Sequence, residues 1–451
     1  MLKYFYLILF SITVFSQNNF DYSFTNPLIV SNDSELGLNR PRIVVNQDGN
    51  PVIIWTSFSE NKLFVSRKME NTFSDPQLIT PEGFMFFSSP NYGPEIYSHE
   101  NNILISLYNV IDGLYNLYVI YSQDGGITFS NPIKIIEENS YIEGAGIHIT
   151  ENNTPVLTYE KLTNSGEASH LISFGQFIEE SPGFIFSDFI IVNESTEGIP
   201  CECCLGDIAS SNLDLVFTYR NNIDNVRNMY ACYYDNENQA FNEGFSIDNY
   251  DQSLTVCPTE GPKSLIHNDF LFSTFKSYAY SPARIGLTVT DYSNEIVQND
   301  FVVDWQQGFG TQSLPEISKN NSHIAIVWKE FRYYNIDVFI SVFDTSIQNN
   351  FSFTPSLSVS SSEPNSTTAE DFTAVDIIGF DDEFHLTYLD YNNKILYYRK
   401  LTPQNNIHLE NFKLNKQKLK TIDILGRNQF KTGLIIDIYN DGSTEKKYRV
   451  K

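Results

Sequence analysis

The sequence predicts an all-β protein, a β-propeller of about seven four-stranded blades, with six blades as the alternative count. Three observations lead to this prediction. A short strand pattern, often introduced by proline, recurs about every 50 to 60 residues, a period typical of propeller blades. Further short strands follow each recurrence, giving four per unit where the pattern is complete. The chain is also rich in Phe and Tyr, which favour strands.

The strands of each unit can be placed from this pattern. We expect the inner strands at residues 41–45, 94–98, 145–149, 206–210, 262–266, 315–319 and 374–378. Second strands that end in an aromatic residue are expected at 51–55, 155–159, 215–219, 324–328 and 384–388. Third strands are expected at 63–66, 117–120, 229–232, 338–341 and 395–398. An outer strand follows a Phe-Ser-Asp/Asn-Pro motif at 73–76 and 129–132.

The two ends of the repeat array predict how the propeller closes. Residues 24–29 copy the outer-strand motif but precede the first complete unit, whereas the seventh unit lacks a clear outer strand after Arg399. We therefore expect the N-terminal strand to complete the last blade, which leaves no open sheet edge. The propeller is expected to span residues 17–405.

Residues 1–16 have the pattern of a signal peptide, with Lys3 followed by an apolar run that ends before Gln17. The run is shorter than the roughly 20 residues that span a bilayer, and no later segment reaches that length. We therefore expect a protein that is secreted or on the cell surface, with no transmembrane segment after signal cleavage. The formal net charge of −26 argues against nucleic acid and anionic membranes as partners, because binding to phosphates requires Lys and Arg.

The turn from Ser122 to Phe129 carries the second sequence motif. Ser122, Asp124, Gly126, Thr128 and Phe129 resemble an Asp-box, the repeated turn of sialidases and related propellers. In such a turn the Asp accepts hydrogen bonds from backbone amides, glycine permits positive φ, and the aromatic residue packs between sheets. We expect this turn to be structural and Asp124 not to be a catalytic acid.

The resemblance to sialidase-like propellers implies an arginine clamp for a substrate carboxylate, a Tyr–Glu nucleophile pair and an acidic residue. The sequence Arg40-Pro-Arg42-Ile43 differs from the Arg-Ile-Pro order common in that family. Charged residues at the ends of second strands, and in the loops that follow them, are expected near the channel. The catalytic candidates among them are Arg220, Glu330 and Arg332, and the ligand-binding candidates are Glu160, Arg227 and Lys276.

All five cysteines lie between residues 201 and 257: Cys201, Cys203, Cys204, Cys232 and Cys257. Cys201 to Cys204 precede the fourth inner strand and Cys257 precedes the fifth, so the two loops should meet on one face. In an exported protein we expect disulfides, at most two, with Cys204 or Cys203 bonded to Cys257. A thiolate cluster holding zinc or copper, or a redox centre, are the alternatives. No other cofactor is expected.

The C-terminal residues 413–451 resemble a type IX secretion sorting segment. The match consists of Asp423-Ile-Leu-Gly-Arg427, a strand led by Gly433, Asp441-Gly-Ser-Thr and a Lys-rich end. A terminal hairpin that packs on the propeller is the alternative. The resemblance implies a Bacteroidetes-type bacterium, the type IX machinery as a partner, and anchoring at or release from the outer membrane.

Two functions remain open from the sequence. One is a sialidase-like propeller that binds, with or without hydrolysing, an extracellular glycan or glycoprotein; as an enzyme it would be a glycoside hydrolase. The other is a non-catalytic surface module for adhesion or interaction. A metal or redox protein is the third reading, and it depends on the state of the cysteines.

Overall fold

The computed structural model describes residues 22–32, 38–57, 61–89, 91–162, 167–179, 183–211, 214–304, 310–332, 335–344, 354–360, 372–403, 418–423, 433–439 and 444–449. Within these ranges the regular secondary structure consists of β-strands, without helices, which confirms the all-β prediction. The chain forms two compact units, Met1–Thr402 and Pro403–Lys451. Residues 1–16 lie outside the described ranges.

The larger unit contains seven antiparallel sheets, which follow one another along the chain. The first consists of β3 (Leu38–Val45), β4 (Pro51–Ser57), β5 (Leu63–Arg67) and β6 (Gln77–Leu78). The second consists of β7 (Glu95–His99), β8 (Asn102–Ile111), β9 (Leu114–Ser122) and β10 (Ile133–Glu138). The third is β11 (Tyr141–Ile149), β12 (Pro155–Leu162), β13 (Ala168–Phe177), β14 (Phe184–Phe186) and β15 (Ile190–Ile191). The fourth is β16 (Ile199–Pro200), β17 (Asp207–Ser211), β18 (Asp214–Asn222), β19 (Met229–Asp235), β20 (Ala240–Phe241) and β21 (Phe245–Ser246).

The remaining three sheets complete the ring. The fifth is β22 (Lys263–His267), β23 (Phe270–Ser277), β24 (Arg284–Asp291) and β25 (Ile296–Val302), and the sixth is β26 (Gln312–Lys319), β27 (His323–Arg332), β28 (Asn335–Asp344) and β29 (Leu357–Ser358). The seventh is β30 (Phe372–Phe380), β31 (Glu383–Asp390) and β32 (Ile395–Pro403), joined by β1 (Tyr22–Phe24) and β2 (Leu28–Ser31).

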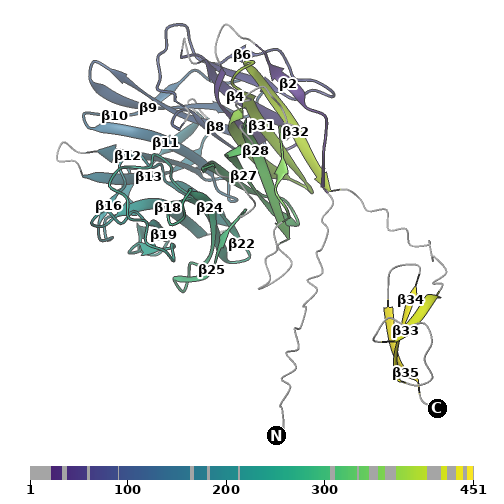
Figure 1. The fold of residues 1–451 in the computed structure, drawn as a ribbon. Helices are drawn as coiled ribbons and strands as arrows, with labels where there is room; N and C mark the ends of the chain where they lie inside the picture. Colours follow the sequence, from purple (N-terminus) through teal and green to yellow (C-terminus); the bar gives the residue numbers. More distant parts are fainter. Residues whose placement is uncertain are drawn as a thin grey trace. The chain divides into compact units, whose positions relative to one another are not determined.

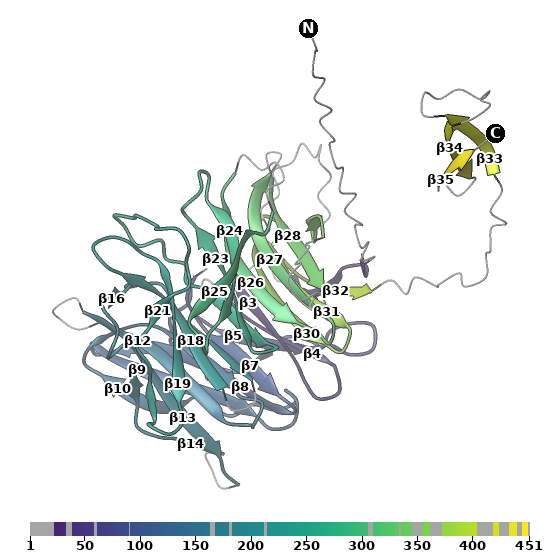
Figure 2. The same cartoon turned by 90° about the horizontal axis from the view of Figure 1, so that it is seen from below.

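These sheets are arranged around a central axis (Figures 1 and 2), and neighbouring inner strands contact each other around the ring. The last inner strand, β30, contacts the first, β3, so the ring is closed. The prediction of a propeller with seven blades is therefore confirmed. The expected inner strands all lie in or directly beside the observed ones, and β6 and β10 follow the two Phe-Ser-Asp/Asn-Pro motifs as expected.

The N-terminal strands close the ring. Both β1 and β2 pair with β32, the third strand of the last blade. Leu28 lies opposite Tyr398, and Arg399 donates a hydrogen bond from Nε to the carbonyl oxygen of Thr25 at 2.9 Å. The first described residues thereby satisfy a sheet edge that would otherwise be exposed.

The hydrophobic core lies between neighbouring sheets. Seven clusters of buried residues are found, and each joins two successive blades. The middle strands are therefore buried on both faces: Val52, Ile53 and Ile54 of β4 are all fully buried. This explains why these strands read as continuous apolar runs instead of alternating ones.

Several inner strands carry a β-bulge where they enter the axial channel. The register of β3 shifts at residues 39–42 and that of β26 at residues 313–316. Arg40 and Leu314 lie within these bulges and have φ values of 45° and 53°. A bulge redirects the side chains that follow it, and here those side chains line the channel.

The smaller unit contains a three-stranded antiparallel sheet, β33 (Lys418–Asp423), β34 (Gly433–Tyr439) and β35 (Thr444–Arg449), with β34 in the middle. The strand that the sequence placed after Gly433 is β34. The motif residues Asp441 to Ser443 lie outside the described ranges.

Candidate functional site

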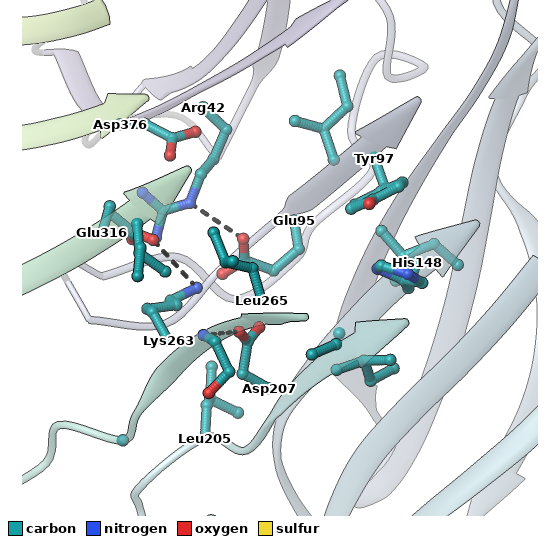
Figure 3. Close-up of a pocket in the computed structure, with 18 of the residues that line it drawn as sticks. Arg42, Glu95, Tyr97, His148, Leu205, Asp207, Lys263, Leu265, Glu316 and Asp376 are labelled. Carbon is teal, nitrogen blue, oxygen red and sulfur yellow. Dashed lines mark hydrogen bonds and ion pairs between the residues drawn. The ribbon is translucent and has the colours of Figure 1, made fainter. Parts of the chain in front are cut away.

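The inner strands enclose a cavity of about 420 Å³ on the propeller axis. Its walls come from the inner strands of all seven blades and from the loops that precede them (Figure 3). We call the side on which the inner strands begin the entry face. A polar cavity of this volume is in the size range of small-ligand sites.

A ring of charged side chains lines the cavity. Each member occupies the corresponding position of the inner strand of its blade. The members are Arg42, Glu95, Asp207, Lys263, Glu316 and Asp376, and the third blade has Gly146 at this position. This ring was not predicted from the sequence, although its charges occupy one corresponding position of the repeat that defines the blades.

Ion pairs connect the ring. Arg42 contacts Glu95 with Nε at 3.0 Å and Glu316 with Nη2 at 3.3 Å, and Lys263 contacts Glu316 at 3.5 Å. Arg40 also pairs with Glu95. Burial raises the pKa of Glu95, but the charges of Arg40 and Arg42 outweigh this effect and hold that pKa well below its usual range. The arginines of the channel are therefore engaged by carboxylates of the protein itself.

Two carboxylates of the ring are held mainly by backbone amides. Asp207 accepts a hydrogen bond from the amide of Ser264 at 2.7 Å, and Asp376 accepts one from the amide of Ile43 at 2.8 Å. Burial raises the pKa of Asp207 to about 6, against the opposing effects of Lys263 and the Ser264 amide. Burial likewise raises the pKa of Asp376. Both groups therefore titrate closer to neutral pH than a solvated Asp.

A second layer below the ring joins three blades through aromatic and hydroxyl groups. The rings of Tyr97 and His148 lie 4.1 Å apart, and His148 Nε2 lies 2.7 Å from the hydroxyl of Ser210. Burial lowers the pKa of His148 to about 3, so this imidazole is neutral at physiological pH. It stabilises the channel wall as a neutral hydrogen-bonding group.

Glu160 of β12 is the predicted ligand-binding residue that lines the cavity. Its side chain is 1% exposed, and no donor in the described part of the chain forms a well-aligned hydrogen bond with either carboxylate oxygen. Burial holds the pKa of Glu160 well above its usual range, and the nearby Cys201 adds to this effect, although the amide of Cys203 partly offsets it. A buried carboxyl group without a well-aligned hydrogen bond is rare in native proteins and points to a ligand.

Arg220 is fully buried within the fourth blade and is not itself among the residues that line the cavity. It donates hydrogen bonds to the carbonyl oxygens of Arg227, Lys276 and Glu260, at 2.8, 3.1 and 3.3 Å, and to Gln252 Oε1 at 3.2 Å. Lys276 in turn pairs with Glu260 at 2.8 Å. These side chains fasten the loop that precedes β22, and their roles as ligand contacts stay predictions.

Glu330 and Arg332 form a buried network in the sixth blade. Glu330 Oε2 accepts hydrogen bonds from Trp328 Nε1 at 3.1 Å, Gln312 Nε2 at 3.1 Å and Arg332 Nη2 at 2.6 Å. Arg332 also pairs with Asp304 at 2.7 Å. Trp328 and Glu330 are two residues apart on one strand, so their side chains share a face of the sheet. The network links β26 to β27, and its catalytic role stays a prediction.

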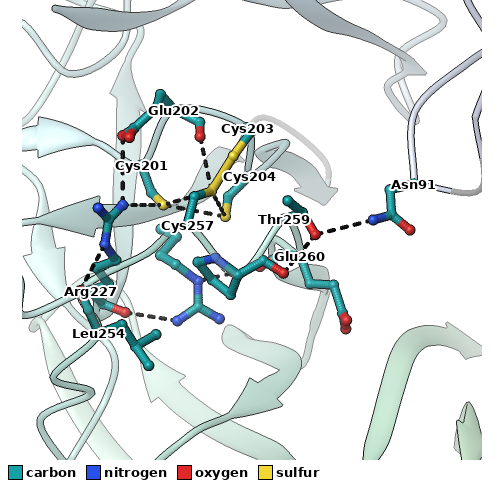
Figure 4. The surroundings of a disulfide bond; sticks show 12 residues. Asn91, Cys201, Glu202, Cys203, Cys204, Arg227, Leu254, Cys257, Thr259 and Glu260 are labelled. Atoms are coloured by element: carbon teal, nitrogen blue, oxygen red, sulfur yellow. Dashed lines mark hydrogen bonds and ion pairs between the residues drawn. A yellow bond between two sulfur atoms is a disulfide. The ribbon is translucent and has the colours of Figure 1, made fainter. Parts of the chain in front are cut away.

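The cysteine loops meet on the entry face, as the sequence predicted (Figure 4). Cys203 and Cys257 form a disulfide, which confirms one of the two expected pairings. Cys201, Cys204 and Cys232 are free thiols and are buried. Cys232 lies on β19, in the core between the third and fourth blades.

Arg227 connects this cluster to the neighbouring loop. It donates hydrogen bonds from Nη1 to the sulfur of Cys201 at 2.8 Å and from Nε to the carbonyl oxygen of Leu254 at 3.2 Å. The hydrogen bond from Cys204 and the positive charge of Arg227 lower the pKa of Cys201, although burial opposes them. In the described part of the chain, Cys201, Cys204 and Cys257 are the group whose side chains lie close enough together to hold a metal ion.

The turn that resembles an Asp-box is held by its own side chains. Asp124 Oδ1 accepts a hydrogen bond from the amide of Thr128 at 2.9 Å, and Oδ2 accepts one from the Thr128 hydroxyl at 2.7 Å. Ser122 Oγ accepts a hydrogen bond from the amide of Gly126 at 2.9 Å. Phe129 packs against the core between the first two blades.

The comparisons with known proteins find only remote similarities. The sequence matches no protein-family model, and no curated protein is significantly similar to it. Among solved structures, a protein of unknown function from Dyadobacter fermentans is 12% identical, with a TM-score of 0.46, over 68% of this chain and 94% of that one. A Hadza microbial sialidase is 12% identical, with a TM-score of 0.41, over 65% of this chain and 63% of that one.

A Trypanosoma rangeli sialidase in complex with sialic acid is 10% identical, with a TM-score of 0.44, over 85% of this chain and 59% of that one. The matched part is thus less than two thirds of either sialidase. Similarity at this level carries no conclusion about a shared activity. Separately, no helix in the described ranges is long and apolar enough to cross a membrane.

Proposed function

We propose that the chain is an exported β-propeller that binds a neutral extracellular glycan at the entry face, through the mouth of the axial cavity. The main support for this proposal is the environment of the Glu160 carboxyl group. Its buried carboxyl group lines the cavity and has neither oxygen engaged in a well-aligned hydrogen bond. A hydroxyl-rich ligand supplies the missing donors, and hydrogen bonds of this kind give sugar sites their specificity.

Aromatic side chains on the same face support a sugar ligand. Phe87, Tyr141, Tyr250 and Phe331 are each at least 42% exposed, and all lie in loops or strand ends at the entry face. Tyr141 lies opposite Leu162, two residues from Glu160, and forms an edge-on ring contact with Tyr115 at 5.1 Å. Exposed rings of this kind offer flat apolar surfaces on which the C–H groups of a sugar ring can pack.

The charges favour a neutral ligand over an anionic one. Arg40 and Arg42 are paired with Glu95, and Arg332 is paired with Asp304 and Glu330. Clamping a substrate carboxylate would require breaking these buried pairs, which is costly. The net charge of −26 adds a general repulsion of anions.

Delivery to the cell exterior is the second half of the proposal. The signal-peptide pattern of residues 1–16 and the resemblance of residues 413–451 to a type IX sorting segment support it. We also interpret the turn from Ser122 to Phe129 as an Asp-box with a structural role, because its side chains bond within the turn. These features concern location and fold, whereas the proposed ligand rests on Glu160, the exposed aromatic side chains and the paired arginines.

A glycan array followed by calorimetry tests the binding proposal. The mature protein should bind a neutral oligosaccharide, and Glu160→Ala should weaken binding by roughly fivefold or more, since leaving one partner of a buried hydrogen bond unsatisfied costs about 1–3 kcal/mol. Glu160 forms no aligned internal hydrogen bond, so the substitution should leave the fold intact. Glu137→Gln, on the solvent side of β10, is the matched control.

The outcomes distinguish an enzyme from a binding module and show which results would contradict the proposal. Release of sugar from the bound glycan would identify a glycoside hydrolase, and binding without release would identify a surface adhesion module. Exclusive binding of anionic glycans, or equal affinity of wild type and Glu160→Ala, would overturn the proposal.

A further inference from the structure

Three cysteine sulfurs form a nearly equilateral triangle at the entry face. The Sγ atoms of Cys201 and Cys257 lie 3.3 Å apart, those of Cys201 and Cys204 3.4 Å, and those of Cys204 and Cys257 3.5 Å. Cys203 is joined to Cys257 by the disulfide, so its sulfur lies beside the same triangle. Four sulfur atoms from two loops are thus gathered at one point of the fold.

This spacing is close to that of a thiolate metal site. Zinc–sulfur bonds of about 2.3 Å in a tetrahedron place neighbouring sulfurs about 3.8 Å apart. An ion about 2.3 Å from all three sulfurs of the observed triangle would lie about 1.2 Å out of their plane, as at one face of a tetrahedron. Small rotations of the side chains widen the triangle to the full spacing, and Cys203 can supply the fourth sulfur.

The surroundings suit a negatively charged cluster. Arg227 is 5% exposed and donates a hydrogen bond to the sulfur of Cys201 at 2.8 Å. Arg220 is fully buried, and its carbonyl oxygen accepts a hydrogen bond from the amide of Cys201 at 2.7 Å. The buried guanidinium group of Arg227 therefore lies beside a sulfur that would carry negative charge, and such outer partners orient and stabilise thiolate ligands.

The two loops hold the sulfurs in place without the disulfide. The amide of Cys204 donates to the carbonyl oxygen of Cys201 at 3.1 Å, and Tyr92 donates from its hydroxyl to the carbonyl oxygen of Cys203. Gly261, in the other loop, lies directly against Leu205. Cys201 and Cys204 are fully buried, whereas Cys203 and Cys257 are partly exposed and accessible to a solution reductant.

We propose that Cys201, Cys203, Cys204 and Cys257 form a redox-gated site for a thiophilic divalent cation of the zinc type. A dithiol reductant transfers two electrons to the Cys203–Cys257 disulfide, becomes a disulfide itself, and leaves two cysteine thiols. The four thiols then release four protons and bind one cation as thiolates. A disulfide oxidant that takes two electrons from the Cys203 and Cys257 thiolates, and is itself reduced to two thiols, restores the protein disulfide, removes two of the ligands and releases the ion. This site does not depend on the proposed glycan ligand.

The test is a cobalt titration of the full chain, because tetrahedral thiolate Co²⁺ has characteristic visible absorption bands. Protein reduced with dithiothreitol and desalted without oxygen should develop these bands up to one equivalent of Co²⁺, and Zn²⁺ should abolish them. The oxidised protein should show none. Cys201→Ser and Cys204→Ser should each weaken binding by roughly tenfold or more, because a ligand is lost.

Cys232→Ser is the matched control, since this buried thiol lies in a blade core away from the cluster. It should bind Co²⁺ as the wild type does. If the cluster variants fail to fold, X-ray absorption of the zinc-loaded wild type decides the question: four sulfur neighbours at about 2.3 Å support the site. Nitrogen or oxygen neighbours, absence of the cobalt bands in the reduced protein, or unchanged binding by folded Cys201→Ser would overturn it.

Discussion

Gly261 passes so close to the carbonyl oxygen of Leu205 that a methyl group on Gly261 would overlap it. The Leu205 side chain in turn fills the space beside Gly144, where a Cβ would also overlap it. This contact joins the loop that carries Cys257 to the loop that carries Cys201–Cys204. The mouth of the cavity and the cysteine cluster therefore depend on one close backbone approach.

Gly261→Ala should destabilise the protein and disturb this contact. An added methyl group in a well-packed region costs about 1–3 kcal/mol, and here it meets backbone, which cannot rotate away. We expect a lower midpoint of urea unfolding and faster reduction of the Cys203–Cys257 disulfide. Gly286→Ala is the control, because a Cβ there would lie at ordinary distances of 3.4 Å or more from its neighbours. Equal midpoints for the two variants would contradict the role of the contact.

The raised pKa of Asp207 should make the free energy of unfolding depend on pH. Its pKa in the folded protein is about 6, above the value of about 3.9 for an unfolded Asp, so the folded state binds the proton more tightly. The wild type should therefore lose stability relative to Asp207→Asn as the pH rises from about 4 to 7, by at most about 3 kcal/mol.

Urea unfolding of wild type and Asp207→Asn at pH 4.5 and 7.5 measures this difference. The comparison between the two proteins removes the contributions of other titrating groups that they share. A free-energy difference that is the same at both pH values would show that burial does not raise the pKa of Asp207 in the folded protein.

Asp124→Ala should lower stability without changing ligand binding. The substitution removes acceptors for the amides of Ile127 and Thr128 and for the Thr128 hydroxyl. Hydrogen bonds to a charged group contribute about 1.5–3 kcal/mol, and the exposure of this turn places the expected loss at the lower end. Thermal unfolding and glycan calorimetry together check it. Lost binding with an unchanged melting temperature would give Asp124 a functional role.

Removal of residues 413–451 should block delivery to the cell surface and leave the propeller folded. The larger unit forms its own seven cores and ends at Thr402, whereas the C-terminal unit forms a separate small sheet. Expression of both forms in a bacterium with a type IX system, followed by surface labelling, measures delivery. Surface labelling of the truncated form at the full-length level would contradict the sorting role.

The blades could be predicted from the sequence because each strand leaves a local pattern. The inner strand that begins near Pro94 and the second strand expected at residues 324–328, which lies within β27, are examples, since turn residues and β-branched runs mark them. Closure of the ring by the strand near Leu28 could be predicted because the outer-strand motif occurs before the first unit and is missing from the last one. The contact between the loops that carry Cys203 and Cys257 could be predicted because these loops precede the inner strands of two neighbouring blades.

The orientation of charged side chains could not be predicted in the same way. Glu330 and Arg220 stand at the ends of second strands, as Glu160 does, but bulges and neighbouring loops decide which of them reach the channel. Glu330 is turned toward Trp328 and Arg332, and Arg220 toward the carbonyl oxygens of an adjacent loop. Such contacts join segments far apart in the sequence, so no local pattern reports them.

Binding of a neutral glycan at Glu160 can be tested by determining the structure of the protein in complex with the glycan that the array selects. We expect a sugar hydroxyl within hydrogen-bonding distance of the Glu160 carboxyl group, at the entry end of the axial cavity. A glycan bound on an outer strand or on the opposite face, with Glu160 still without a partner, would contradict it.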